Sequence, residues 1–447
     1  MKYAKVRRYV FLIPLHVWGF ISVPNYHRHT WMNKLHNLVY KKLLYMAFVL
    51  SLALQHACTF VYAIHDLPEF LQRLFESVLV VTCVVDLVFY NFKFDEITEL
   101  FDLLEKEFKV TDKKIHRKYL TIEFFEVVVF FACSIFSMVG ILSETFLPVS
   151  ERNLYLMSTV YRRKYPDKIL PLNFWTPSFI DPSEMPYFVL FYLFEVYAVA
   201  MVLTVVFERL FILASFPTSL LGQYKMLAEL VKLIGVELKD NAGENIFYTE
   251  IAHGTYISET QLLNLISNDM PGTSKQDMAL KLKRWAKKDY PDFYLKQIIK
   301  RHQELDHVMV KYTQYSVSYY NLLILLCLVL WLLAFYQLAY MLHLSIFNFF
   351  KIIMEFIFTF LSYVHFNMQS ERLTSCNESI ARALGRCGWY NCSPAVRRKI
   401  CIFVNSVRRP RQFCLFGNSL EMSKPHLISV LKMAFSFINF MQLQGPL

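Results

Sequence analysis

The stretch Tyr312–Leu342, YTQYSVSYYNLLILLCLVLWLLAFYQLAYML, decides the fold class, because its 31 residues include no Asp, Glu, Lys or Arg. An α-helix rises about 1.5 Å per residue, so about 20 apolar residues cross the roughly 30 Å hydrocarbon core of a bilayer. The composition of the whole chain agrees. Of its 447 residues, 55% are hydrophobic and 19% are charged, whereas a soluble domain carries about 25% charged residues. We therefore predict an all-α integral membrane protein.

Six further stretches have the length and composition of membrane-spanning helices, which gives seven predicted spans in all. The six are Leu43–Ile64, Leu71–Phe92, Val127–Ser143, Met185–Phe207, Leu344–Ser370 and Pro425–Gln444. Several carry internal charges, such as Lys351 and Glu355, which are four residues apart on one helical face and can neutralise each other. The first twenty residues imitate a signal peptide. Because no small-residue cleavage site follows and Pro14 interrupts the apolar run, we expect a segment at the membrane surface rather than a cleaved signal.

The Lys and Arg residues between the spans predict the orientation, because cytoplasmic loops carry the excess of these residues. Residues 1–42 hold eight Lys or Arg and no acid, and residues 371–424 hold ten against three acids. This distribution predicts a cytoplasmic N-terminus and an extracellular C-terminus. Residues 148–184, predicted to lie outside, disagree with it, because they carry Arg162, Arg163 and Lys164.

Enzymatic and metal-binding signals are missing from the sequence. No GxSxG, HExxH or nucleotide-binding glycine loop occurs, so we predict no enzyme and no cofactor. The spacing of Cys387 and Cys392 is not the short paired pattern of a structural zinc site, so free thiols are expected. The net charge of +11 lies largely in segments that flank the membrane. Anionic lipid headgroups account for such charge, and no nucleic-acid partner is expected.

Aromatic residues gather in the outer halves of several predicted spans. An apolar cavity with few polar groups suits small volatile or lipophilic molecules, and the alternative is ordinary packing with an interfacial aromatic belt. Glu195 lies among aromatic residues, where it can orient a polar group of a ligand or pair with a Tyr hydroxyl or water. The predicted ligand-binding residues are Phe75, Val78, Phe136, Ser137, Ile141, Phe194, Glu195, Tyr197, Phe335, Tyr336 and Tyr340.

The last 75 residues of this membrane protein carry several sequence motifs. These are Ala383 followed by Trp389-Tyr390, then Arg397-Arg398-Lys399, Arg408-Arg409-Pro410, and a closing Leu431-Lys432 with Phe435-Ser436-Phe437. In this combination they resemble the C-terminal region of insect odorant receptors. The predicted topology of the whole chain resembles that family too, with seven spans, a cytoplasmic N-terminus and a long loop after the fourth span.

The resemblance implies an odorant-gated, nonselective cation channel subunit in the plasma membrane of sensory neurons. Such a tuning receptor is implied to form a tetramer with subunits of an odorant co-receptor, and monovalent and divalent cations would permeate. A G-protein-coupled receptor is disfavoured, because its N-terminus would lie outside and the seventh span lacks NPxxY. A gustatory-type receptor channel is the closest alternative. A transporter is a third reading, which would require internal repeats that the sequence does not show.

Three regions are expected along the chain. Residues 1–370 hold six spans, the outer ligand pocket and a long cytoplasmic loop at 218–313, residues 371–424 form a cytoplasmic anchor, and residues 425–447 form a pore-lining helix. The anchor would use Trp389 and Tyr390 at subunit contacts. One stripe of the last helix recurs at spacings of three and four and would form a hydrophobic gate, unless it packs on other helices. The predicted gate residues are Met433, Ser436, Phe440 and Leu443, and the predicted pore-mouth residues are Asn439, Gln442 and Gln444.

Overall fold

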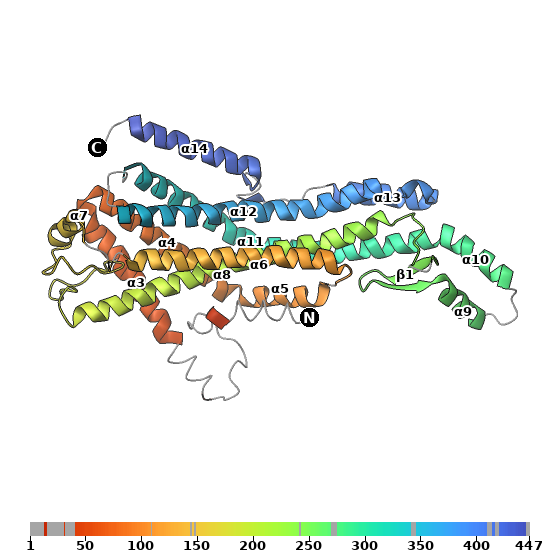
Figure 1. Cartoon of the computed structure of the whole chain (residues 1–447), viewed down its shortest axis with the longest axis horizontal. Helices are drawn as coiled ribbons and strands as arrows, with labels where there is room; N and C mark the ends of the chain where they lie inside the picture. The colour runs from red at the N-terminus through yellow and green to blue at the C-terminus, as the bar shows by residue number, and fades with distance from the viewer. Residues whose placement is uncertain are drawn as a thin grey trace.

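The computed structural model describes residues 13–15, 31, 41–108, 110–143, 145–146, 149–240, 243–269, 275–340, 346–408, 414–415 and 420–443. Within them the chain is mostly helical, as predicted, and forms one elongated bundle (Figure 1). The long helices are α3 (Lys41–Val61), α4 (Leu67–Phe92), α6 (Lys113–Ser143), α8 (Tyr187–Lys232), α11 (Tyr290–Tyr340), α12 (Ile346–Arg386) and α14 (Lys424–Leu443).

Five helices of the described chain are long and apolar enough to cross a membrane. They lie within Tyr45–His65, Leu67–Phe92, Lys113–Leu142, Tyr187–Lys232 and Tyr290–Gln337. These ranges contain or overlap five of the predicted spans, and α12 and α14 lie at the other two. The chain is therefore a multi-pass helical protein with the composition that a membrane requires.

Helix α4 begins four residues earlier than the hydropathy predicts, and its first turn explains why. Asp66 caps the helix, since its side chain accepts a hydrogen bond of 3.0 Å from the backbone N–H of Glu69. Pro68 follows in the first turn, where its missing N–H is no loss. Such a cap stabilises a helix end by about 1 kcal/mol. The charged first turn of α4 is thus part of the helix rather than of a loop.

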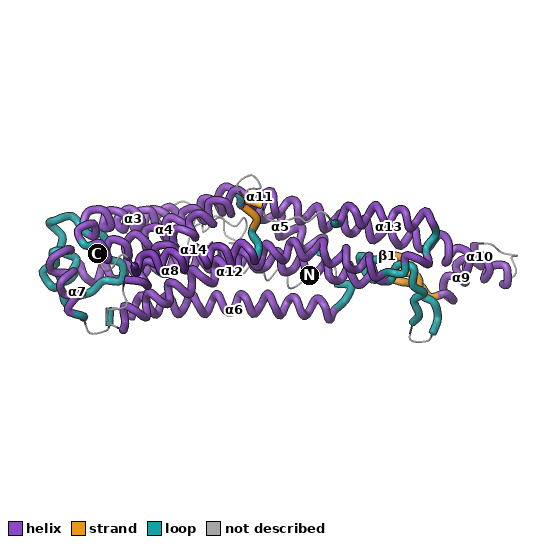
Figure 2. Tube along the Cα trace, turned by 90° about the horizontal axis from the view of Figure 1, so that it is seen from above, coloured by secondary structure: helices purple, strands orange, loops and turns teal. Residues whose placement is uncertain are grey.

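Helices α8, α11 and α12 form the centre of the bundle and continue beyond it. Helix α8 packs mainly on α12 and α6, and α11 packs on α4 and α12. With 46 residues, α8 is about 69 Å long, more than twice the hydrocarbon thickness. Both views show these helices extending past α5 (Phe94–Glu107) into a narrow stalk (Figures 1 and 2).

The two ends of the bundle differ in structure. At one end, here called the α7 end, lie α7 (Glu151–Tyr155), a π-helical turn (Leu156–Val160) and the loop to Pro186. The stalk carries α13 (Pro394–Val407), α9 (Glu259–Asp269), α10 (Lys275–Lys288) and an antiparallel hairpin of β1 (Ile246–Glu250) with β2 (Thr255–Ser258). A second short pair, β3 (Cys414–Leu415) with β4 (Leu420–Glu421), precedes α14.

Candidate ligand site

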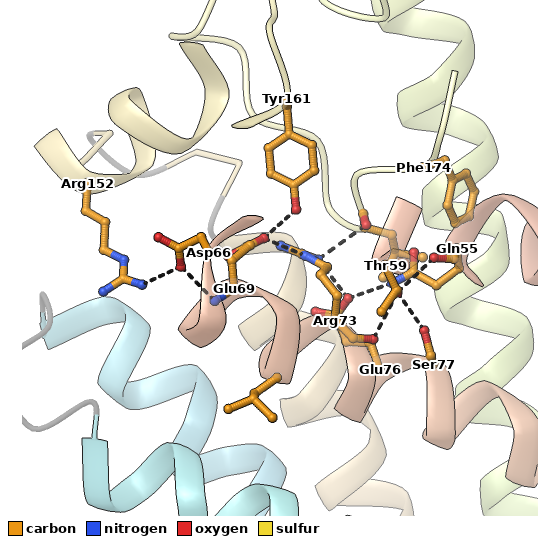
Figure 3. A network of polar contacts seen from close by, with 12 residues as sticks. Gln55, Thr59, Asp66, Glu69, Arg73, Glu76, Ser77, Arg152, Tyr161 and Phe174 are labelled. Atoms are coloured by element: carbon orange, nitrogen blue, oxygen red, sulfur yellow. Dashed lines mark hydrogen bonds and ion pairs between the residues drawn. The ribbon is translucent and has the colours of Figure 1, made fainter. Parts of the chain in front are cut away.

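A buried arginine organises the α7 end of the bundle. Arg73 of α4 is only 4% exposed. Its Nε lies 2.8 Å from Oε1 of Glu69, and its Nη1 lies 2.7 Å from Oε2 of Glu76 (Figure 3). These residues are three or four positions apart on one helix, so all three side chains share a face. Both carboxylates are themselves buried, and the guanidinium offsets their charge where water cannot.

The network around Arg73 joins three parts of the chain. Helix α3 contributes Gln55, whose Nε2 donates to Glu76 at 2.9 Å. The loop contributes Tyr161, whose hydroxyl donates to Glu69 at 2.5 Å, and the carbonyl of Leu172, which accepts from Arg73 at 3.3 Å (Figure 3). Because these groups come from α3, α4 and the loop, the network fixes the loop over the ends of both helices.

Glu195 of α8 holds the same loop from the other side. Its carboxylate is fully buried and accepts the backbone N–H of Leu172 at 2.8 Å and of Phe174 at 3.2 Å. The sequence left two roles open for this carboxyl, ligand orientation or pairing with a Tyr hydroxyl or water. In the structure its partners are instead backbone amides of the loop, so Glu195 holds the loop against α8.

Several buried polar atoms near the loop have no hydrogen-bond partner among the described residues. They are Nη1 of Arg163, Oε1 of Gln55 and Oδ1 of Asn173. Burial lowers the pKa of Arg163, because the charged guanidinium is poorly solvated there. Unmatched buried groups of this kind are the usual partners of internal water or of a polar ligand group.

One group of predicted pocket residues comes together between α4, α11 and α12. Phe75 is 1% exposed and packs against Leu330 and Ala334, with Val78 beside it. On α11, the ring of Phe335 contacts that of Phe356 on α12, with centroids 5.0 Å apart and edge to face. These side chains lie in the half of the bundle nearest the α7 end.

A second group lies on α8 beneath the loop. The rings of Phe194 and Tyr197 are stacked with centroids 6.3 Å apart, and Phe174 of the loop contacts Phe194 at 5.5 Å. These residues surround Glu195 on the helix. The loop thus supplies an aromatic residue to the site, which the sequence analysis did not identify.

Predicted residues of α6 divide between the surface and the interior. Phe136 is 58% exposed and therefore points away from the bundle. Ser137 turns inward, and its buried Oγ has no hydrogen-bond partner in the described chain. Ile141 is partly buried, as is Tyr336 of α11. Tyr340 is the last residue of α11, and its side chain lies outside the described parts.

Among its described side chains, helix α14 has a buried side and an exposed one. Val430 and Ala434 are buried, whereas Met433 is 59% and Phe440 54% exposed. The predicted pore residues Ser436 and Asn439 are exposed as well. Leu443 and Gln442 end the helix without described side chains, and Gln444 lies outside the described residues. Most of the stripe predicted for the gate is thus uncovered in a single chain.

Residues predicted to form the anchor make a close backbone contact in the stalk. The N–H of Gly388 donates to the carbonyl of Ile234 at 2.9 Å, and a Cβ at Gly235 would lie 2.2 Å from the carbonyl oxygen of Gly388. The next residues, Trp389 and Tyr390, are 45% and 64% exposed. Two large aromatic side chains are therefore exposed at this turn.

Sequence reasoning missed the network around Arg73, although its signal was present. Arg73 and Glu76 count as penalties in a hydropathy window, yet their spacing from each other and from Glu69 is that of helical ion pairs. Tyr161 and Leu172 carry no local signal, because the fold alone brings the loop onto α4.

Comparison with known proteins gives one family and one fold. The family model described as 7tm Odorant receptor matches residues 66–435. The insect olfactory receptor OR5 from Machilis hrabei has a similar structure, with a TM-score of 0.66 at 14% identity, both alone and in complex with eugenol. In both cases the match covers 99% of this chain, and it covers 98% of the eugenol-bound receptor and 99% of the unliganded one. No curated protein matches the chain.

Proposed function

We propose that this chain, which belongs to the 7tm odorant receptor family, is a subunit of an odorant-gated, nonselective cation channel. Membership confirms the resemblance read from the C-terminal motifs and the prediction that the chain is not an enzyme. Receptor function and a multi-pass membrane helical fold follow from the family. Channel activity, the membrane topology, the subunit assembly and the roles of individual residues are what we propose.

For the topology we propose seven spans, formed by α3, α4, α6, α8, α11, α12 and α14. The α7 end and the C-terminus would face the outside, and the stalk the cytoplasm of a sensory neuron. The ten Lys or Arg against three acids in residues 371–424 support this orientation. The amphipathic helix α5 would lie at the inner surface, between the spans and the stalk.

For the ligand we propose a small, neutral, lipophilic odorant held beneath the loop at the α7 end. The support is the apolar cluster around Phe75, the ring contact of Phe335 with Phe356, and the second group around Tyr197. The similar receptor from Machilis hrabei is described in complex with eugenol, a small aromatic molecule. Tighter binding to the open arrangement would shift the channel towards that state.

For the pore we propose four helices around a common axis, α14 of this chain and the corresponding last helices of the other subunits. The observation that carries the channel proposal is the uncovered stripe of Met433, Ser436 and Phe440 on a helix that otherwise packs by one side. Phe440 and Leu443 would contribute to an apolar ring that excludes water until ligand binding widens it, with Asn439, Gln442 and Gln444 at the mouth. Co-receptor subunits would complete the tetramer, with Trp389 and Tyr390 at anchor contacts.

The test is current recording from cells that express this chain, with and without the co-receptor, across an odorant panel. We expect odorant-evoked cation current in the presence of the co-receptor. In a Ser436→Cys variant, a charged methanethiosulfonate reagent should block that current, whereas Ala434→Cys, which is buried, should respond like the unmodified chain. Absence of evoked current in both assemblies would contradict the channel, and equal responses of the two variants would place the pore elsewhere.

A further inference from the structure

A partly enclosed cavity lies between α4, α5, α8 and α11, away from the site at the α7 end. It holds about 600 Å³ of empty space, counted with its mouth. Phe89 of α4, which lines it, is 14 residues beyond Phe75, which is about 21 Å along the helix. The cavity is therefore separate from the proposed odorant pocket.

Stacked aromatic pairs form the walls of the cavity. The rings of Phe89 and Tyr319 are stacked with centroids 4.1 Å apart, and those of Phe216 and Tyr312 with centroids 4.2 Å apart. Each pair joins α11 to another helix, so the walls are fixed by packing between elements. A space bounded by such pairs is pre-formed and suits a planar apolar molecule.

One charged side chain in the wall has unused hydrogen-bond donors. Arg209 is 4% exposed and lines the cavity. Its Nη1 lies 3.3 Å from Oδ2 of Asp86, and the other oxygen of that carboxylate, Oδ1, accepts the hydroxyl of Tyr319. Within the described chain, Nε and Nη1 of Arg209 make no hydrogen bond. Leaving buried donors of a charged group unmatched is unfavourable, so an acceptor in the cavity would gain a strong partner.

We propose that this cavity is a second small-molecule site, which takes a neutral, lipophilic ring compound with one carbonyl-type acceptor directed at Arg209. Asp86 already balances the charge of Arg209, so an anion would meet a carboxylate at the same place. A neutral carbonyl accepts the spare N–H without that repulsion. The aromatic walls then bury the rings.

An occupant of this site would act on the helix that leads to the stalk. Glu99 of α5 pairs with Lys311 of α11, and it accepts at 3.1 Å the hydroxyl of Tyr315, a residue of α11 that lines the cavity. The cavity thus lies where α5 closes on α11, at the start of the stalk. A molecule bound there stabilises the arrangement of α4, α8 and α11 in which the cavity exists, and so modulates the receptor from a place other than the odorant pocket.

Photolabelling tests occupancy without requiring channel activity. The full-length receptor in lipid nanodiscs is irradiated with benzophenone, whose excited carbonyl inserts into nearby C–H bonds, and the adducts are mapped by mass spectrometry. We expect adducts on the α5, α8 and α11 peptides around Ile97, Ile212 and Ser316. Ser316→Phe, which fills the cavity, should remove them, whereas Ser318→Phe, on the exposed face of the same helix, should not. No adducts there, or equal adducts in both variants, would overturn the proposal.

Competition on the unmodified receptor tests the acceptor and does not depend on any variant folding. Acetophenone and α-methylstyrene have nearly the same shape, but only acetophenone carries an acceptor oxygen. Acetophenone should displace benzophenone at about tenfold lower concentration, as a hydrogen bond to a charged donor implies. A variant that combines Asp86→Leu with Arg209→Met should lose this preference. Equal competition by both compounds in the unmodified receptor would refute the role of Arg209.

Discussion

Replacing Arg73 by Met should destabilise the receptor strongly. The guanidinium lies 2.8 Å from Glu69 and 2.7 Å from Glu76, and both carboxylates are only 4% and 6% exposed. Met is close in length, so the packing of the side-chain stem changes little while the charge disappears. Removing one partner of a buried ion pair costs about 3–5 kcal/mol, because the other charge stays buried and unpaired. Here two carboxylates are left, so we expect a loss in the upper part of that range.

The measurement is thermal unfolding of the purified receptor in nanodiscs, with Arg152→Met as the matched control. Arg152 also pairs with a carboxylate at the same end of the bundle, Asp66, but at 3.5 Å and with 36% and 25% of the two side chains exposed. Pairs of this kind contribute about 0–1 kcal/mol. The melting temperature should therefore fall sharply in Arg73→Met and hardly at all in Arg152→Met.

A rescue separates electrostatics from packing. Adding Glu69→Gln and Glu76→Gln to Arg73→Met removes the unpaired charges and leaves neutral amides, so most of the lost stability should return. Equal small effects of Arg73→Met and Arg152→Met would show that Arg73 does not hold this end together. A large loss that the two glutamines fail to restore would refute the electrostatic explanation.

Three further substitutions, the first with a matched control, test the anchor, the pocket and the gate. Gly235→Ala should disrupt the anchor and reduce tetramer formation in native gels, because its Cβ would lie 2.2 Å from the Gly388 carbonyl oxygen. Gly243 has a positive φ like Gly235 but open space around it, so the control Gly243→Ala should reduce stability by only about 1–2 kcal/mol. Phe75→Ala should shift the half-maximal concentrations of some odorants about tenfold or more, since it removes a buried wall, and unchanged dose–response curves would exclude it from the pocket. Phe440→Ser should raise ligand-independent current by admitting water, and normal basal current at normal surface expression would place the gate elsewhere.

Hydropathy predicted the helices well and their extents less well. The fourth predicted span ends at Phe207, because Glu208 and Arg209 follow, yet α8 continues without a break to Lys232. A hydropathy window counts each charge as a cost. In the structure the charge of Arg209 is offset by Asp86 on α4, a partner more than a hundred residues away in the sequence. The pairing that makes the charge tolerable therefore lies outside any local window.

The sequence predicted which aromatic residues the spans carry but not which faces of the helices they occupy. Phe75 and Phe335 are buried, because they lie on the inward faces of their helices. Phe136 has the same local sequence signal but points outward, since the orientation of α6 is set by its packing on α8 and α12. Glu195 binds loop amides that no sequence pattern places beside it.

The charges on α4 bear on how a ligand can open the proposed channel. Near one end Arg73 binds two glutamates and the loop, and near the other Asp86 binds Arg209 of α8 and Tyr319 of α11. Breaking the buried Asp86–Arg209 pair costs about 3–5 kcal/mol, and each buried hydrogen bond that is lost costs about 1–3 kcal/mol more. A ligand with micromolar affinity has only about 8 kcal/mol of binding free energy in total. Sliding α4 past its neighbours would keep the ion pairs of Arg73, which lie within α4, but would break the Asp86–Arg209 pair and the hydrogen bonds to Gln55, Tyr161 and Leu172, at a cost comparable to that free energy. A ligand between the two sets of contacts is therefore expected to move α4 together with the loop and the adjoining parts of α8 and α11 as one body.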